Sequence, residues 1–173
     1  DDEVIGCGGT LALHREQGDP VTVVIAFDGA LGGDPARRRR EALAGGAHLG
    51  LAEYRFLDYP EGHEPSDGEL AGPTRALAEL IEREAPRVVY APWRGEQHVD
   101  HRVLSRAVAG ALDLARFRGE VGWYEVWTPL AAACVVDVTR VWPAKLAALR
   151  EHASQLAASD LERLTTELAA HRG

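Results

Sequence analysis

The chain has 173 residues, 46% of them hydrophobic, and a formal net charge of −8. This length suits one domain with a sizeable core and is too short for two ordinary ones, so we expect a single domain over residues 1–173. The acidic balance disfavours nucleic acid as a partner, because phosphate backbones attract basic surfaces. We find neither an apolar run long enough to span a bilayer nor a signal-peptide pattern, and we expect a cytoplasmic protein.

The predicted strands and helices alternate along the chain. Runs rich in β-branched and aromatic residues predict strands over 21–27, 54–60, 87–92, 122–130 and 134–139. Apolar periodicity predicts helices over 8–16, 36–49, 69–84, 100–116, 143–158 and 160–170. This alternation predicts an α/β fold, a Rossmann-like three-layer sandwich with a mostly parallel sheet. Residues 61–73, "EGHEPSDGELAGP", are predicted to form a long functional loop.

The first predicted helix, in "DDEVIGCGGTLALH", has no strand before it. In this architecture a strand should precede that helix, so we expect the first strand of the sheet to lie upstream of residue 1. The sequence contains no methionine, which agrees with residues missing upstream. The two cysteines, Cys7 and Cys134, lack the spacing of a zinc knuckle or a redox pair, and we expect both to be buried, reduced thiols.

Two short motifs could carry chemistry. Asp1, Asp2 and Glu3 stand just ahead of the first helix, where capping of the positive end of the helix is the favoured explanation when the triplet is taken alone. His98 and His101 follow the strand at 87–92, and their spacing places both imidazoles on one face of a helical turn beside Asp100. Because both motifs should open at the carboxyl ends of parallel strands, we expect them to converge on one site. Aspartate and histidine without a thiolate suit zinc or a similar divalent ion.

The order and spacing of several segments carry a family resemblance. The segments "DDEVIGCGGTLALH", "VTVVIAFDG", "RRREALAGGAHLG", "YPEG", "HVDH" and "HASQ" together resemble the LmbE-like (PIG-L) zinc-dependent N-acetylglucosaminyl deacetylases. The resemblance implies hydrolysis of an N-acetyl amide on an amino sugar or an amino-sugar conjugate. It covers nearly the whole chain, and its two metal motifs are specific together.

The resemblance also implies a role for each residue of the two motifs. Asp1 matches the general base, while Asp2 and His101 match two metal ligands; the third, a histidine, is expected upstream of residue 1. His98 matches the residue that stabilises the oxyanion, and Asp100 would orient it. We therefore expect zinc in the intact protein and weak or absent zinc binding by this chain.

Other functional positions of the family match residues of this chain less directly. Arg38 aligns with an arginine that contacts substrate hydroxyls, although a solvated helix face explains the basic run "ARRRREAL" as a whole. Glu61 stands where the family more often has aspartate in a "PDG" turn, and its longer side chain would reshape the sugar pocket. Lys145, His152 and Gln155 are explained by helix packing or surface exposure as readily as by a functional role.

Two other hypotheses stay open at this point. The first is a non-catalytic α/β domain that binds a nucleotide or cofactor, suggested by "FDGALGG" after a strand and by fold analogy. It predicts a thermal shift with nucleotides and none with zinc or a chelator. The second is a degenerate deacetylase-like subunit that folds and stays inactive. A homo-oligomer is compatible with either, and the sequence does not name the sugar.

Overall fold

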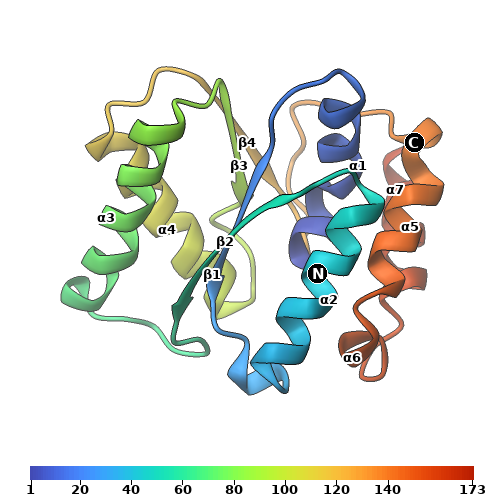
Figure 1. The fold of residues 1–173 in the computed structure, drawn as a ribbon, viewed down its shortest axis with the longest axis horizontal. Coiled ribbons are helices and arrows are strands. Elements are labelled where there is room, and N and C mark those ends of the chain that lie inside the picture. Colours follow the sequence, from blue (N-terminus) through green and yellow to red (C-terminus); the bar gives the residue numbers. More distant parts are fainter.

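Four short strands lie at the centre of the molecule between two groups of helices (Figure 1). The computed structural model describes residues 1–173. The strands are β1 (Thr22–Phe27), β2 (Glu53–Tyr59), β3 (Val88–Pro92) and β4 (Glu120–Tyr124). The helices are α1 (Asp2–Glu16), α2 (Pro35–His48), α3 (Asp67–Glu84), α4 (Val99–Leu114), α5 (Trp142–Arg150), α6 (Ala153–Leu156) and α7 (Leu161–Arg172). Two 3₁₀ turns are η1 (Ala30–Gly32) and η2 (Thr139–Val141).

The strands form two parallel pairs, β1 with β2 and β3 with β4. Helices α2 and α4 make the connections within the pairs, as parallel strands require. The α/β class and the parallel pairing predicted from the sequence are therefore confirmed, while the strands pair as two ladders instead of one sheet. In the first ladder Thr22 lies opposite Glu53, and the register shifts between Ile25 and Phe27.

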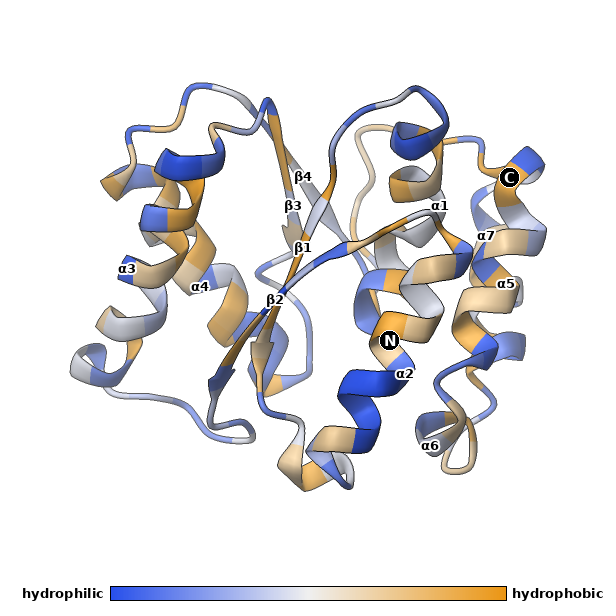
Figure 2. Ribbon diagram, viewed as in Figure 1, coloured by the Kyte–Doolittle hydropathy of each residue, from blue (hydrophilic) through white to orange (hydrophobic).

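Two hydrophobic clusters hold the helices against the strands. The larger includes Val4 on α1 and Leu149 on α5, each with no exposed surface. The smaller packs α3 against α4 and β3, with Ala111 fully buried at its centre. Hydrophobic residues mark the central strands in Figure 2, whereas the amino-terminal half of α2 is hydrophilic. No helix combines the length and the apolar character that crossing a bilayer requires.

The predicted loop over residues 61–73 is wrong for its second half, which is helical. Helix α3 begins at Asp67 because Ser66 and Glu69 form a capping box. The Ser66 Oγ accepts the backbone N–H of Glu69, and the Glu69 carboxylate accepts the backbone N–H of Ser66 at 2.8 Å. The irregular segment before the helix is correspondingly short. Similarly, the helix predicted over 143–158 is interrupted at His152, between α5 and α6.

The strand predicted over residues 134–139 is also wrong. Val135 and Val136 are 60% and 46% exposed, and Cys134, predicted to be buried, lies at the surface, whereas Cys7 is buried as predicted. A β-branched run forms a strand only where a neighbouring strand accepts it, and β4 pairs with β3 alone. The fourth strand likewise ends at Tyr124 instead of continuing to residue 130.

Candidate active site

A pocket of about 500 Å³ opens at the carboxyl ends of the strands. Residues at or next to the last position of every strand line it: Phe27, Asp58, Pro92 and Tyr124. The amino-terminal turns of α1 and α4 and the start of α2 form the walls of this pocket. Parallel α/β sheets bind ligands at this end of their strands, so the fold itself points to this pocket.

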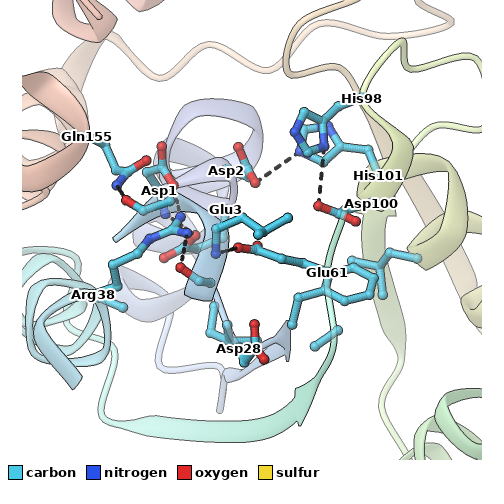
Figure 3. A pocket seen from close by; sticks show the side chains of 18 of the residues that line it. Asp1, Asp2, Glu3, Asp28, Arg38, Glu61, His98, Asp100, His101 and Gln155 are labelled. Atoms are coloured by element: carbon cyan, nitrogen blue, oxygen red, sulfur yellow. Dashed lines mark hydrogen bonds and ion pairs between the residues drawn. The ribbon is translucent and has the colours of Figure 1, made fainter. Parts of the chain in front are cut away.

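The structure brings the two sequence motifs together in this pocket. Asp2 is the first residue of α1, and His101 lies in the first turn of α4. Their side chains meet at 3.0 Å between Asp2 Oδ2 and His101 Nε2 (Figure 3). The His101 side chain is only 6% exposed, whereas that of Asp2 is 40% exposed and faces the pocket.

Charge and burial act in opposite directions on this pair. Burial works to raise the pKa of Asp2, but the hydrogen bond and charge of His101 outweigh it, and the pKa falls to about 2. Burial works to lower the pKa of His101, but its bonds to Asp2 and Glu96 raise it overall. The imidazole is thus held between two carboxylates, an arrangement that favours a cation at this position.

Glu96 is a residue of this site that the sequence motifs did not include. Its side chain is fully buried, and Oε2 lies 3.3 Å from His101 Nδ1. Its Oε1 accepts the backbone N–H groups of Val126, Trp127 and Thr128 at 2.7 to 3.3 Å. From Val126 onward, the N–H groups that follow β4 therefore bond to a carboxylate and not to a strand. The signal in the sequence was a glutamate five positions before His101, in the same loop between strand and helix.

His98 lies beside His101, and their ring centroids are 4.9 Å apart. Its side chain is 51% exposed, and its Nδ1 lies 3.6 Å from Asp100 Oδ2. That distance makes an ion pair and is too long for a hydrogen bond. The other oxygen of Asp100 accepts the backbone N–H of Gly62 at 2.7 Å. Asp100 therefore joins the α4 turn to the loop that carries Glu61.

Asp1 and Arg38 occupy the opposite side of the pocket (Figure 3). Asp1 Oδ1 and Arg38 Nη2 are 3.5 Å apart, and Arg38 Nη1 donates to the Gly29 carbonyl at 3.2 Å. Gly29 has a φ of 73°, and a Cβ there would lie 2.7 Å from Arg38 Nη1, so the glycine allows the guanidinium to approach. Arg38 is thus part of the pocket and not of a solvated helix face.

The other predicted substrate residues divide between the pocket and the packing of the fold. Glu61 Oε1 accepts the Leu31 N–H at 2.6 Å, and Gln155 Nε2 donates to a carbonyl on the same 3₁₀ turn at 3.2 Å. His152 also lines the pocket and is buried, and burial lowers its pKa to about 4. Lys145 does not reach the pocket; it donates to the Ile5 carbonyl at 2.8 Å and anchors α1 to α5.

Comparison with known families agrees with this geometry. The model of the family PIG-L, described as GlcNAc-PI de-N-acetylase, matches residues 1–112. The chain belongs to the PIG-L family. This confirms the resemblance found from the motifs, and the matched range includes every residue of both motifs.

Individual relatives of this PIG-L chain are named as deacetylases. A 1D-myo-inositol 2-acetamido-2-deoxy-alpha-D-glucopyranoside deacetylase from Kineococcus radiotolerans is 29% identical over 90% of this chain, and a diacetylchitobiose deacetylase from Thermococcus kodakarensis is 27% identical over the same share. The chain spans 66% of the length of each of these two relatives.

Two solved structures show how far the fold extends. The conserved protein TT1542 from Thermus thermophilus has a TM-score of 0.86 and 26% identity, covering 100% of this chain and 84% of that one. GalB, a 4-carboxy-2-hydroxymuconate hydratase from Pseudomonas putida, has a TM-score of 0.78 and 25% identity, covering 99% and 81%. Since a hydratase and deacetylases share this fold, the reaction has to be argued from the site.

The residues of the PIG-L chain match the donor types of a zinc site. Asp2 Oδ2 and His101 Nε2 are 3.0 Å apart, and with Glu96 accepting at Nδ1 both atoms are acceptors that need a shared cation, either a proton or a metal ion. An oxygen and a nitrogen donor suit zinc. No group of three His, Cys, Asp or Glu side chains converges here, so the chain fits two of the three protein ligands that catalytic zinc takes.

Proposed function

We propose that this protein hydrolyses the N-acetyl amide of an amino sugar or amino-sugar conjugate, using a zinc-bound site. The observation that carries the proposal is the meeting of Asp2 with His101 beside Asp1 and His98, in a pocket at the carboxyl ends of the strands. Membership of the PIG-L family and the deacetylase relatives support it.

Asp2 and His101 would hold the metal, and a histidine encoded ahead of Asp1 would complete the ligand set. Zinc, when bound, supplies a Lewis acid that polarises the amide carbonyl and lowers the pKa of a water molecule. Glu96 sits behind His101 as the acceptor for its other ring nitrogen, the arrangement by which carboxylates orient zinc-binding imidazoles.

Asp1 is the proposed general base. Its side chain is 9% exposed and held by Arg38, which leaves the carboxylate fixed at the wall of the pocket next to Asp2. A fixed carboxylate beside the attacking water can accept its proton as the water adds to the carbonyl carbon. Arg38 restrains the base and also lies within reach of sugar hydroxyls.

His98 is the proposed acid and oxyanion partner. It is the more exposed of the two imidazoles, and Asp100 faces its Nδ1 at 3.6 Å. A cationic His98 would stabilise the developing oxyanion and then protonate the leaving amine. Glu61 would contact the sugar through its second oxygen, since its first already accepts the Leu31 N–H.

The test uses the full natural protein, including whatever its gene encodes ahead of Asp1. We expect about one zinc per chain and release of acetate from N-acetylglucosaminides. Asp1→Ala should lower kcat by about 10²- to 10⁴-fold, the usual contribution of a positioned base. Glu167→Ala is the control, because that exposed carboxylate lies outside the pocket and pairs with Arg163 at 2.8 Å. Acetate release that survives Asp1→Ala would exclude this mechanism, and the non-catalytic alternatives predict no acetate from any form.

A further inference from the structure

Glu96 is a buried carboxylate with no arginine or lysine partner. The residue is 1% exposed, and the nearby Arg102 donates to its backbone carbonyl at 3.2 Å, not to its side chain. Backbone N–H groups and one imidazole are the partners of the carboxylate. An isolated buried charge is strongly unfavourable, so a carboxylate kept here is held by these bonds and restrains the groups that make them.

We propose that Glu96 is a positioning residue that fixes the ring of His101 for metal binding and couples it to the pocket wall at residues 126–128. The inference rests on the proposed function, because it assigns a role toward the metal to a residue that touches neither substrate nor metal.

The hydrogen bond from His101 to Glu96 decides which ring nitrogen of His101 faces the metal. A carboxylate only accepts, so Glu96 Oε2 requires a proton on His101 Nδ1. That leaves the Nε2 lone pair directed at the space beside Asp2 Oδ2, 3.0 Å away, where a metal would bind. Glutamine at position 96 could turn an NH₂ group toward Nδ1, and the ring would then carry its proton on the metal side.

Backbone hydrogen bonds connect Glu96 to the pocket wall at residues 126–128. Oε1 of Glu96 accepts from Val126 at 2.7 Å, and both of its oxygens lie 3.2 Å from the Trp127 nitrogen. Trp127 lines the substrate pocket. Two further bonds clamp the same segment: Gln97 N–H to Thr128 Oγ1 at 2.8 Å, and Trp93 Nε1–H to the Thr128 carbonyl at 2.8 Å. One carboxylate thus joins the ligand His101 to the wall that a sugar would contact.

The test compares Glu96→Gln with a control that loosens the same segment. Thr128→Val removes the hydroxyl that accepts the Gln97 N–H and leaves the Glu96–His101 contact in place. Zinc affinity of the full natural protein is measured by competition with a chelator, beside thermal unfolding. We expect Glu96→Gln to weaken zinc binding by about 10- to 100-fold, the usual effect of losing such a carboxylate. Thr128→Val should lower the unfolding temperature and leave the zinc affinity within about twofold, because the hydroxyl that it removes bonds only to the Gln97 N–H, while the Thr128 backbone N–H still donates to Glu96.

A second measurement needs no variant and serves also if Glu96→Gln does not fold. Zinc added to the wild-type protein should slow hydrogen exchange at the amides of Val126 and Trp127, because both donate to the carboxylate behind the ligand. Wild-type zinc affinity in a folded Glu96→Gln, an equal loss in Thr128→Val, or unchanged exchange at these amides would each overturn the inference. If the wild-type protein binds no zinc, the proposed function fails together with it; wild-type binding with a neutral Glu96→Gln overturns only the role of Glu96.

Discussion

Asp2 and His101 are 99 positions apart in the chain, and their side chains meet at 3.0 Å between Oδ2 and Nε2. Each is carried by the first turn of a helix, α1 or α4, and those turns face one another across the carboxyl ends of the strands. The fold therefore builds the site from two local motifs, each of which is carried by the first turn of a helix. Changes in either turn should affect activity before they affect stability.

The exposed side chain of His98 should contribute strongly to catalysis and little to stability. His98→Gln is expected to lower kcat by about 10²- to 10³-fold with a small change in KM, because a glutamine amide cannot carry the positive charge or transfer the proton that the imidazole supplies as charge develops. Steady-state kinetics of acetate release measure both constants. His48→Gln is the control: that histidine is similarly exposed and pairs with Glu151 at 3.0 Å, outside the pocket. A loss confined to KM would show that His98 binds substrate in the ground state.

The meeting of the two motifs in one pocket was predictable from the sequence because each motif is local. Asp1 and Asp2 are adjacent, and His98 and His101 lie within one helical turn. The rule that ligands bind at strand ends predicts where these two motifs lie. Glu96 was not predictable in the same way. Its role depends on backbone groups at residues 126–128, which no periodicity of the sequence places next to it.

The errors in the predicted strands have a tertiary cause. A run such as "CVVDVT" has strand propensity, but a strand needs a partner, and whether one is available is decided by tertiary pairing. Cys134, expected to be buried because the spacing of the two cysteines fits neither a zinc knuckle nor a redox pair, lies in this run and is exposed. By contrast, the start of α3 follows a local signal, because Ser66 and Glu69 have the spacing of a capping box. Arg38 differs from the rest of its basic run because Gly29 has no side chain, which allows the Arg38 guanidinium to approach the backbone at Gly29.

The charge of the pocket predicts discrimination among amino sugars. Seven carboxylates line it with two arginines, and both arginines are paired: Arg38 with Asp1 at 3.5 Å and Arg39 with Asp58 at 2.6 Å. No unpaired arginine or lysine is available for a phosphate. We expect kcat/KM for N-acetylglucosamine 1-phosphate to be at least about tenfold below that for the neutral methyl glycoside, since one like-charge contact at 4 Å amounts to about 1–4 kcal/mol.

Two measurements check this charge effect. Added salt should narrow the difference in kcat/KM between the two substrates, because it screens the repulsion between the phosphate and the carboxylates of the pocket. Asp28→Asn should narrow it as well, since the amide oxygen can still accept the Ala30 N–H at 3.0 Å while one charge is lost from the wall. Equal or better hydrolysis of the phosphate would mean that the carboxylates do not select the substrate.

Stability should fall in mild acid because of His152. Burial lowers its pKa from 6.5 to about 4 in the folded state, so between these values the unfolded chain binds more protons. The contribution of neutral His152 to the free energy of unfolding is fully present above pH 6.5 and is lost as the pH falls toward 4. Because one pKa unit corresponds to about 1.36 kcal/mol, the free energy of unfolding falls by about 3 kcal/mol over this range. Urea unfolding from pH 7 to 4 should show that the free energy of unfolding falls less in His152→Gln than in the wild type. His48→Gln should keep the wild-type slope, and the same slope in all three proteins would contradict the assignment.

The contact between α2 and α5 should tolerate no side chain at Gly45. A Cβ there would lie 2.8 Å from the Ala148 carbonyl oxygen and 3.1 Å from His152 Nε2, and the first of these is backbone that cannot rotate away. We expect Gly45→Ala to destabilise the protein by about 1–3 kcal/mol through overpacking, measured by urea unfolding.

Gly68 supplies the matched control for this substitution. It also lies in a helix, and a Cβ there would meet nothing closer than the Ser66 Oγ at 4.0 Å. Gly68→Ala should be neutral or should stabilise by up to about 1 kcal/mol, because alanine restricts the unfolded chain and favours the helix. Opposite signs for the two variants would place the difference in packing, since helix propensity alone predicts a gain at both positions. A stabilised Gly45→Ala would show that α2 and α5 can move apart, and the pocket wall formed by His152 would then be adjustable.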